Sequence, residues 1–160
     1  LMFGTTPAQF GYLPGDVLDM VATADVSVYN NVRSVSIKIS DIRLAGVPQD
    51  EVCRQRRVYE NYLSGEMDPQ GAALLCPSRE DAAGVYRFLS RLGGFPYGAD
   101  LLYQRLMGSG IGYGKMMVVL DALTESGLIT ADSEGYHICT VDGKVDLMGT
   151  PAICRLTELK

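Results

Sequence analysis

Two runs of alternating polar and apolar residues, 16–29 and 32–44, stand on either side of Asn30-Asn31. Asparagine tolerates a positive φ at both central positions of a two-residue turn, so this pattern predicts a β-hairpin. With Tyr29 opposite Val32, apolar pairs alternate with polar pairs along the hairpin. The apolar pairs are Val26–Val35, Ala24–Ile37 and Ala22–Ile39, and the polar pairs are Ser27–Ser34, Asp25–Ser36 and Thr23–Lys38. A slip of one residue would destroy both rows, so the register is strongly specified.

Toward the open end of this hairpin the polarity inverts. The same register places Asp41 opposite Met20 and Leu44 opposite Val17. A β-bulge or a covering element is therefore expected there. A hairpin of two strands is at best marginally stable in water, so we also expect it to need further partners.

Helical signals begin after Pro48. Helices are predicted over residues 50–63, 79–92, 100–107, 113–126 and 151–159, from apolar residues at helical spacing and from caps such as Ser78 and Gly127. The segment 65–77 contains glycine and proline and is predicted to be an irregular connection. A second hairpin is predicted around Ser133-Glu134-Gly135. From residue 79 onward the order is three helices followed directly by a hairpin, which is the order of a winged-helix unit, so the predicted class is α+β.

Composition limits the functions that this chain can have. With 160 residues, 47% of them hydrophobic and 21% charged, it is a globular chain of one large or two small domains. A net charge of −5 argues against holding duplex DNA mainly by neutralising phosphates. The four cysteines are scattered and His137 is the single histidine, so no metal site is predicted and the thiols are expected to be free. No apolar run approaches the roughly 20 residues that span a bilayer, so a cytoplasmic protein without membrane partners is predicted.

Two motifs resemble the C-terminal region of RecJ, the single-stranded-DNA-specific exonuclease, in the form found in Gram-positive, clostridia-like bacteria. The family's barrel hairpin runs approximately N-E-[WY]-N-G-x-R-S-V-Q-L-x-[IV]-x-D-I-R, and this chain has SVYNNVRSVSIKISDIR. It departs from that pattern at Ser27, Val28, Asn31 and Ser36. The family's C-terminal portion carries P-x-R-E-x-x-x-x-V-Y-R-x-L, E-x-G-L-I and K-V-D-L, which are similar to PSREDAAGVYRFL, LDALTESGLI and GKVDL here.

The resemblance implies a fold and a division into domains. Residues 1–47 would be the C-terminal part of an OB-fold, with the end of a third strand at residues 1–3, a short helix around 7–12 and the last two strands. Residues 48–78 would be a connecting helix and linker, and 79–160 a winged-helix-like domain. An incomplete OB-fold half-barrel followed by a winged-helix-like unit is therefore expected. Since the sequence begins at Leu1 with no leader pattern, we interpret it as a piece of a longer protein.

The resemblance also implies that the chemistry lies elsewhere. The family's catalytic domains bind manganese or magnesium through an Asp-His-His motif and other acidic ligands, and none of these motifs occurs here. The parent would be a metal-dependent hydrolase of phosphodiester bonds. This chain alone is predicted to be inactive, with no catalytic residue and no cofactor of its own.

Six residues are candidates for contact with nucleic acid. OB-folds commonly hold single strands with the barrel groove and the loop between the last two strands, by stacking bases on aromatic rings and guiding phosphates with basic groups. In or beside that loop lie Tyr29, Asn30, Asn31 and Arg33, and on the following strand lie Lys38 and Arg43. Alternatively, Tyr29 and Arg33 only flank a turn, and Lys38 discourages edge-to-edge aggregation.

Other segments are weaker candidates. The helix over 113–126 would be a recognition helix, but its exposed side is predicted to carry Asp121 and Glu125 beside Lys115. The stretch GSGIGYGK, residues 108–115, looks like a phosphate loop but lacks its G-K-[ST] ending, so a turn before a helix is predicted. His137 is predicted to be a half-buried packing residue.

Two functions remain open from the sequence. The first is a non-catalytic part of a 5'-to-3' single-strand DNA exonuclease of recombination and repair, which holds the DNA or docks a partner such as single-strand-binding protein. The second is a free-standing winged-helix transcription regulator with a dimerising β-arm. A barrel without its first strands exposes sheet edges and an apolar face, which predicts either a homo-oligomer or a close contact between the two halves of the chain.

Overall fold

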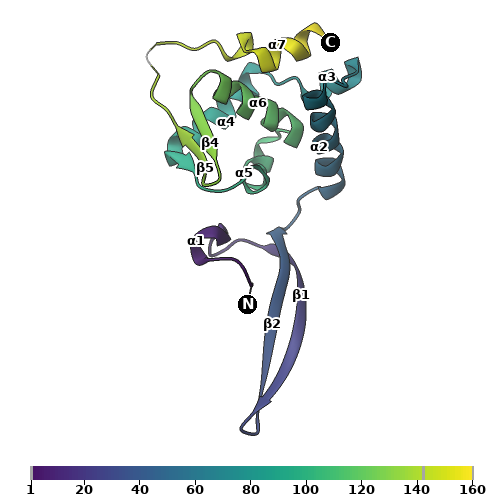
Figure 1. Cartoon of the computed structure of the whole chain (residues 1–160), viewed down its shortest axis with the longest axis vertical. Helices are drawn as coiled ribbons and strands as arrows, with labels where there is room; N and C mark the ends of the chain where they lie inside the picture. The colour runs from purple at the N-terminus through teal and green to yellow at the C-terminus, as the bar shows by residue number, and fades with distance from the viewer. Residues whose placement is uncertain (1, 142, 160) are drawn as a thin grey trace. The chain divides into compact units, whose positions relative to one another are not determined.

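The computed structural model describes residues 2–141 and 143–159. The chain divides into two compact units, Leu1–Val47 and Pro48–Lys160, which we describe separately. The fold class is α+β, as predicted: the first unit contains a two-stranded antiparallel sheet, and the second combines helices with a three-stranded antiparallel sheet (Figure 1).

The first unit is dominated by the predicted hairpin. Its strands are β1 (Leu18–Tyr29) and β2 (Val32–Leu44). Asn30 and Asn31 form the turn with φ values of 50° and 62°, the left-handed conformation that a tight hairpin turn requires. All six predicted apolar and polar cross-strand pairs are confirmed, from Ser27–Ser34 to Ala22–Ile39.

A β-bulge interrupts the ladder where the predicted polarity inverts. The register shifts between Val21 and Ala22, which leaves Ser40 without a cross-strand partner. The predicted bulge is thus confirmed, but the pairs predicted beyond it were wrong: Leu44 lies opposite Leu18, and Met20 lies opposite Ile42. The extra residue moves Ile42 and Leu44 onto the same face as Ile37 and Ile39. Apart from Arg33, which lies opposite Val28, one face of the hairpin therefore stays apolar from the turn to Leu44.

This apolar face is exposed to solvent within the first unit. Val26 and Val35, which lie opposite each other, are 60% and 67% exposed, and Met20 and Ile37 are also exposed. The helix α1 (Pro7–Phe10) lies within the range expected for a short helix, and the Tyr12 hydroxyl donates to the Ile42 carbonyl over 3.0 Å. Of the expected third strand, Met2 makes a single parallel bridge to Ile39, and Leu1 lies outside the described residues. The described residues form no closed barrel.

The second unit contains the predicted helices, within one residue at each end. These are α2 (Gln49–Ser64), α4 (Arg79–Leu92), α5 (Ala99–Leu106), α6 (Tyr113–Glu125) and α7 (Pro151–Glu158). Ser78 caps α4 as expected, accepting from the Asp81 amide over 3.1 Å. The predicted hairpin is β4 (Ile129–Asp132) and β5 (Gly135–Ile138), and β5 also pairs with β3 (Gly94–Phe95), so that the sheet order is β3-β5-β4.

Residues 65–77 are not the irregular connection that was predicted, because they contain the helix α3 (Pro69–Leu75). Asp68 caps this helix, accepting from the Gly71 amide over 2.6 Å, and Pro69 occupies its first turn. Ala72 and Leu75 are fully buried. A segment of seven residues that contains a proline and a glycine carries too weak a periodic signal to predict a helix. Tertiary packing stabilises this short helix in the folded protein.

The helix α6 lies at the centre of the second unit. It packs against α2, α3, α4, α5, α7 and β4. Its buried residues point to all sides of the helix: Tyr113, Gly114, Met116, Val118, Val119, Leu120, Ala122 and Leu123. Among the described residues, all the buried hydrophobic side chains lie between Val52 and Leu156, so the core belongs to the second unit. No described helix is both long and apolar enough to cross a lipid bilayer.

Candidate nucleic-acid interface

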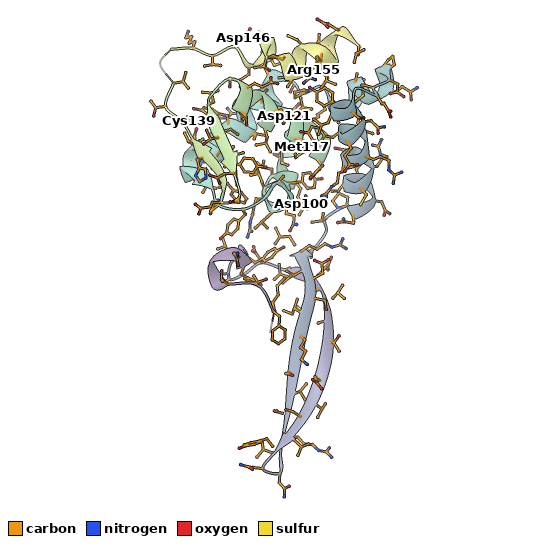
Figure 2. All side chains as sticks on the ribbon, in the orientation of Figure 1. Asp100, Met117, Asp121, Cys139, Asp146 and Arg155 are labelled. Carbon is orange, nitrogen blue, oxygen red and sulfur yellow. The ribbon has the colours of Figure 1, made fainter. Side chains whose placement is uncertain are left out.

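All six predicted contact residues lie on the β1–β2 hairpin. Tyr29, Asn30, Asn31 and Arg33 surround the turn, which we call the tip, while Lys38 and Arg43 lie further along β2. The tip is open to solvent: Tyr29 is 77% exposed, and Asn30, Asn31 and Arg33 are also exposed. Figure 2 shows the side chains of β1 and β2 projecting from both faces of the hairpin.

The register decides which of these side chains share a face. Tyr29, Lys38 and Arg43 lie on the polar face, since they pair with Val32, Thr23 and Asp19. Arg33 lies opposite Val28, on the apolar face. Tyr29 and Arg33 therefore flank the turn from opposite faces of the hairpin.

The two cations on the polar face are each held by an aspartate of β1. Lys38 Nζ lies 2.8 Å from Asp25 Oδ2, and Arg43 Nε lies 3.5 Å from Asp19 Oδ2. The hydrogen bond from Lys38 lowers the pKa of Asp25 below its usual value, so this carboxylate stays ionised at neutral pH. Asp41 lies opposite Val21 on the same face. Two cations against three carboxylates leave one surplus negative charge on the polar face.

Arg33 differs from these two cations. Among residues 2–141 and 143–159 it forms no ion pair. It is exposed and belongs to the second cross-strand pair from the turn. The predicted register already placed Asp25 diagonally opposite Lys38, so the first ion pair could have been recognised in the sequence. The second could not, because it depends on the shift at Ser40 that brings Arg43 opposite Asp19.

The candidate recognition helix offers little surface to a duplex. Asp121, labelled in Figure 2, does not lie on an open side of α6, since it accepts from the Tyr59 hydroxyl of α2 over 2.7 Å. Burial raises the pKa values of both Asp121 and Tyr59. Glu125 accepts from the Ala152 amide of α7 over 2.9 Å, and Lys115 Nζ lies 3.9 Å from Asp81. The prediction that Asp121 lies on an exposed side was wrong, because α2 and α7 cover α6.

The glycine-rich stretch before α6 is a turn, as predicted. Its Gly110 has a φ of 82°, and Gly112 occupies the N-cap position of α6. The Gly114 amide at the start of the helix donates to the Gln55 side-chain oxygen over 2.9 Å. A side chain of the protein thus takes up the Gly114 amide, which is then not free to donate to a phosphate.

His137 is exposed, so its predicted packing role was wrong. Its Nε2 lies 3.1 Å from Asp132 Oδ1 across the β4–β5 hairpin, and this side-chain hydrogen bond lowers the pKa of Asp132. Strand alternation explains the difference, because the neighbouring Tyr136 and Ile138 take the packed side of β5.

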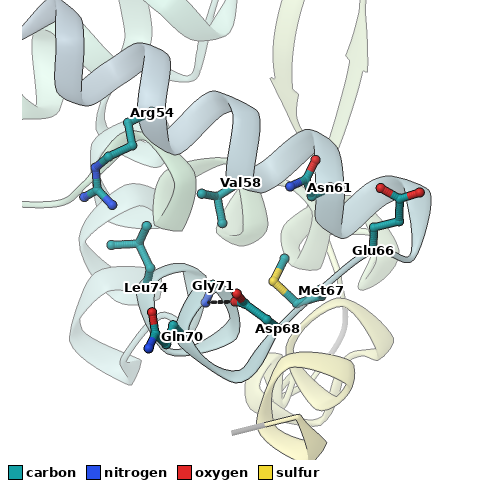
Figure 3. Close-up of a pocket in the computed structure, with 9 residues that line it drawn as sticks. All are labelled: Arg54, Val58, Asn61, Glu66, Met67, Asp68, Gln70, Gly71 and Leu74. Carbon is teal, nitrogen blue, oxygen red and sulfur yellow. Dashed lines mark hydrogen bonds between the residues drawn. The ribbon is translucent and has the colours of Figure 1, made fainter.

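A groove lies between α2 and α3, with a volume of about 590 Å³ (Figure 3). Arg54 lines it but is held by Glu51 at 2.6 and 2.8 Å, and Asp68 caps α3. The remaining lining is Val58, Asn61, Glu66, Met67, Gln70, Gly71 and Leu74. Among these remaining seven residues Glu66 is the one ionisable side chain, so they do not form an acid–base pair. No three histidine, cysteine, aspartate or glutamate side chains in the described part of the chain are grouped to hold a metal.

Comparisons of the chain with protein-family models, with curated proteins and with solved structures find no match.

Proposed function

We propose that this chain is a non-catalytic part of a 5'-to-3' single-stranded-DNA exonuclease related to RecJ, acting in recombination and repair. The observation that carries the proposal is the hairpin. The hairpin carries the quoted family motif. On one of its faces polar side chains form hydrogen bonds with each other, as Ser27 does with Ser34 and Lys38 with Asp25. Its other face is apolar and stays exposed within the first unit.

An incomplete OB-fold accounts for that asymmetry. In a barrel the inward face of each strand is apolar and is covered by the remaining strands. The parallel bridge between Met2 and Ile39 supports this reading, because a strand ending at Met2 would lie along the outer edge of β2. A bulge such as the one at Ser40 bends a strand in the way that barrel closure needs.

The second unit supports a structural or docking role. From α4 to β5 its order is helix, strand, helix, helix, strand and strand, and this order, with the sheet order β3-β5-β4, fits a winged-helix-like domain. Its central helix is covered over most of its surface, and the β4–β5 hairpin carries Asp132 and Glu134. Under this proposal the unit braces the barrel or docks a protein partner, single-strand-binding protein being one candidate.

The proposal assigns the chemistry to other domains of the parent. Water activated by manganese or magnesium would attack the phosphodiester there. Residues 1–160 would contribute to holding the substrate or to docking a partner, and not to the chemical step.

A winged-helix transcription regulator is the alternative, favoured by the element order of the second unit. Major-groove recognition needs an exposed helix, and in α6 only Thr124 and Glu125 are exposed. The net charge of −5 also opposes attraction to a duplex.

Fluorescence anisotropy with single- and double-stranded oligonucleotides, across a salt series, separates the two functions. We expect the chain to bind single strands in preference to duplexes. A clear preference for duplex would support the regulator and reject the exonuclease assignment.

A further inference from the structure

We infer that the hairpin contacts a single DNA strand only at its tip, with one base stacked on Tyr29 and one phosphate beside Arg33. The strand then crosses the end of the hairpin and does not run along β1 and β2. This inference rests on the proposed function and specifies how the same surface binds.

The charges on the polar face disfavour a path along the strands. Lys38 and Arg43 would be the phosphate contacts on such a path, but Asp25 and Asp19 already neutralise them. Asp41 adds a further carboxylate to the same face. A phosphate chain laid there would meet a surface of net negative charge and would have to displace two ion pairs.

The opposite face is unsuited to the DNA backbone for another reason. Apart from Arg33 it presents aliphatic side chains, from Val28 and Val35 to Ile42 and Leu44. Burying phosphates against these would remove water without replacing its hydrogen bonds.

The tip has what the two faces lack. Tyr29 offers an exposed ring to a base, and base stacking on aromatic rings is tolerant of sequence. Arg33 has no described ion pair, and the amides of Asn30 and Asn31 can donate to and accept from base edges. Because Tyr29 and Arg33 lie on opposite faces, a strand that touches both must cross the turn.

The salt dependence of binding separates this path from the path along the strands. A protein that neutralises Z phosphates of a single strand shows a slope of about −0.7Z in a plot of log K against log salt. Contact through Arg33 alone predicts a slope of about −0.7, whereas contact through Arg33, Lys38 and Arg43 predicts about −2. The measurement is an NMR titration of the whole chain with an oligothymidylate of about ten nucleotides, in salt from about 50 to 200 mM.

Two sets of variants test the contacts. We expect Tyr29→Ala to weaken binding about tenfold, and Tyr29→Phe, which keeps the ring, to leave it unchanged. Lys38→Ala should change the affinity less than about twofold, since Lys38 is paired with Asp25 and does not contact the strand. The double variant Asp19→Asn with Asp25→Asn frees both cations, so it should bind more tightly and steepen the slope to about −2.

The outcomes are distinct. A wild-type slope near −2, or a loss of binding in Lys38→Ala equal to that in Tyr29→Ala, would overturn the inference and leave the proposed function standing. Absence of single-strand binding by the wild type would overturn both. A slope near −0.7 together with sensitivity to Tyr29→Ala would support the tip as the contact.

Discussion

At the residue scale, Asp121 illustrates how a charge can be placed inside the second unit. It sits on α6 against α2, and its hydrogen bond from Tyr59 favours the ionised form, but burial outweighs that bond and raises its pKa. The neighbouring charges have opposite effects, since Glu125 raises this pKa and Arg155 lowers it. Folding therefore works against the ionised form of this carboxyl group.

The pH dependence of stability follows from the direction of this shift. A raised pKa means that the unfolded chain releases the proton first, so the protein loses stability as the pH rises from about 3.8 to the higher folded value. Asp121→Asn removes the charge and keeps an oxygen that can accept from Tyr59. We expect the variant to be more stable than the wild type at neutral pH and the difference to vanish below about pH 3.8.

Urea unfolding at neutral and acidic pH measures this difference. Glu134→Gln, in the exposed turn between β4 and β5, is a control with the same change of charge, and we expect almost no effect. If Asp121→Asn were less stable than the wild type at neutral pH, the ionised carboxylate would be stabilising.

At the element scale, the central helix α6 depends on small residues where other elements approach it. A Cβ on Gly114 would collide with Leu75 of α3, which is fully buried. Gly84 of α4 is the matched control, because a Cβ there meets no atom within 4 Å.

The two glycines predict opposite effects for the same substitution. Gly84→Ala should stabilise the protein by about 0.5–1 kcal/mol, the usual preference for alanine within a helix. Gly114→Ala should destabilise it by about 1–2 kcal/mol, since overpacking exceeds that gain. Chemical denaturation of both variants checks this, and equal stabilisation by both would show that Leu75 moves away at no cost.

The hairpin as an element has one face without cover in its own unit. Val26 and Val35 are exposed partners on that face, and threonine keeps their β-branched shape while adding a hydroxyl group. We expect Val26→Thr with Val35→Thr to reduce the binding of an apolar dye such as anilinonaphthalene sulfonate. A control pair on the polar face, Ser27→Thr with Ser34→Thr, should not reduce it. Equal dye binding by the wild type and the Val26–Val35 variant would place the exposed apolar surface elsewhere.

At the scale of the whole molecule, the two units differ in what stabilises them. All the buried hydrophobic side chains among the described residues lie in the second unit, while the first relies on one hairpin ladder and a short helix. Two strands alone are marginally stable. The stability of the chain should therefore be a property of residues 48–160.

Expression of residues 48–160 alone tests this division. We expect the fragment to unfold cooperatively, with a midpoint within a few degrees of that of the full chain. Residues 1–47 alone should show no cooperative transition. A large fall in the midpoint of the longer fragment would mean that the hairpin contributes to the stability of the second unit.

Local patterns were sufficient for the elements that carry a strong period or a clear cap. Neighbouring residues along the chain were sufficient to predict the turn at Asn30-Asn31 and the cross-strand pairs between that turn and Ile39. They were also sufficient for the helix that Ser78 caps and the helix that ends before Gly127. These signals are local because backbone conformation and side-chain alternation are set within a few residues. The candidate residues at the tip were found in this way.

Contacts between segments far apart in the sequence determined the features that local patterns could not predict. The burial of Ala72 and Leu75 stabilises the α3 helix. Asp121 is not on an open side of α6, because α2 covers that side and Tyr59 donates to its carboxylate. The bulge at Ser40 brings Arg43 onto the polar face opposite Asp19, where this carboxylate neutralises it. Helical and strand periods tell which side chains share a face, whereas contacts between distant segments determine what that face meets.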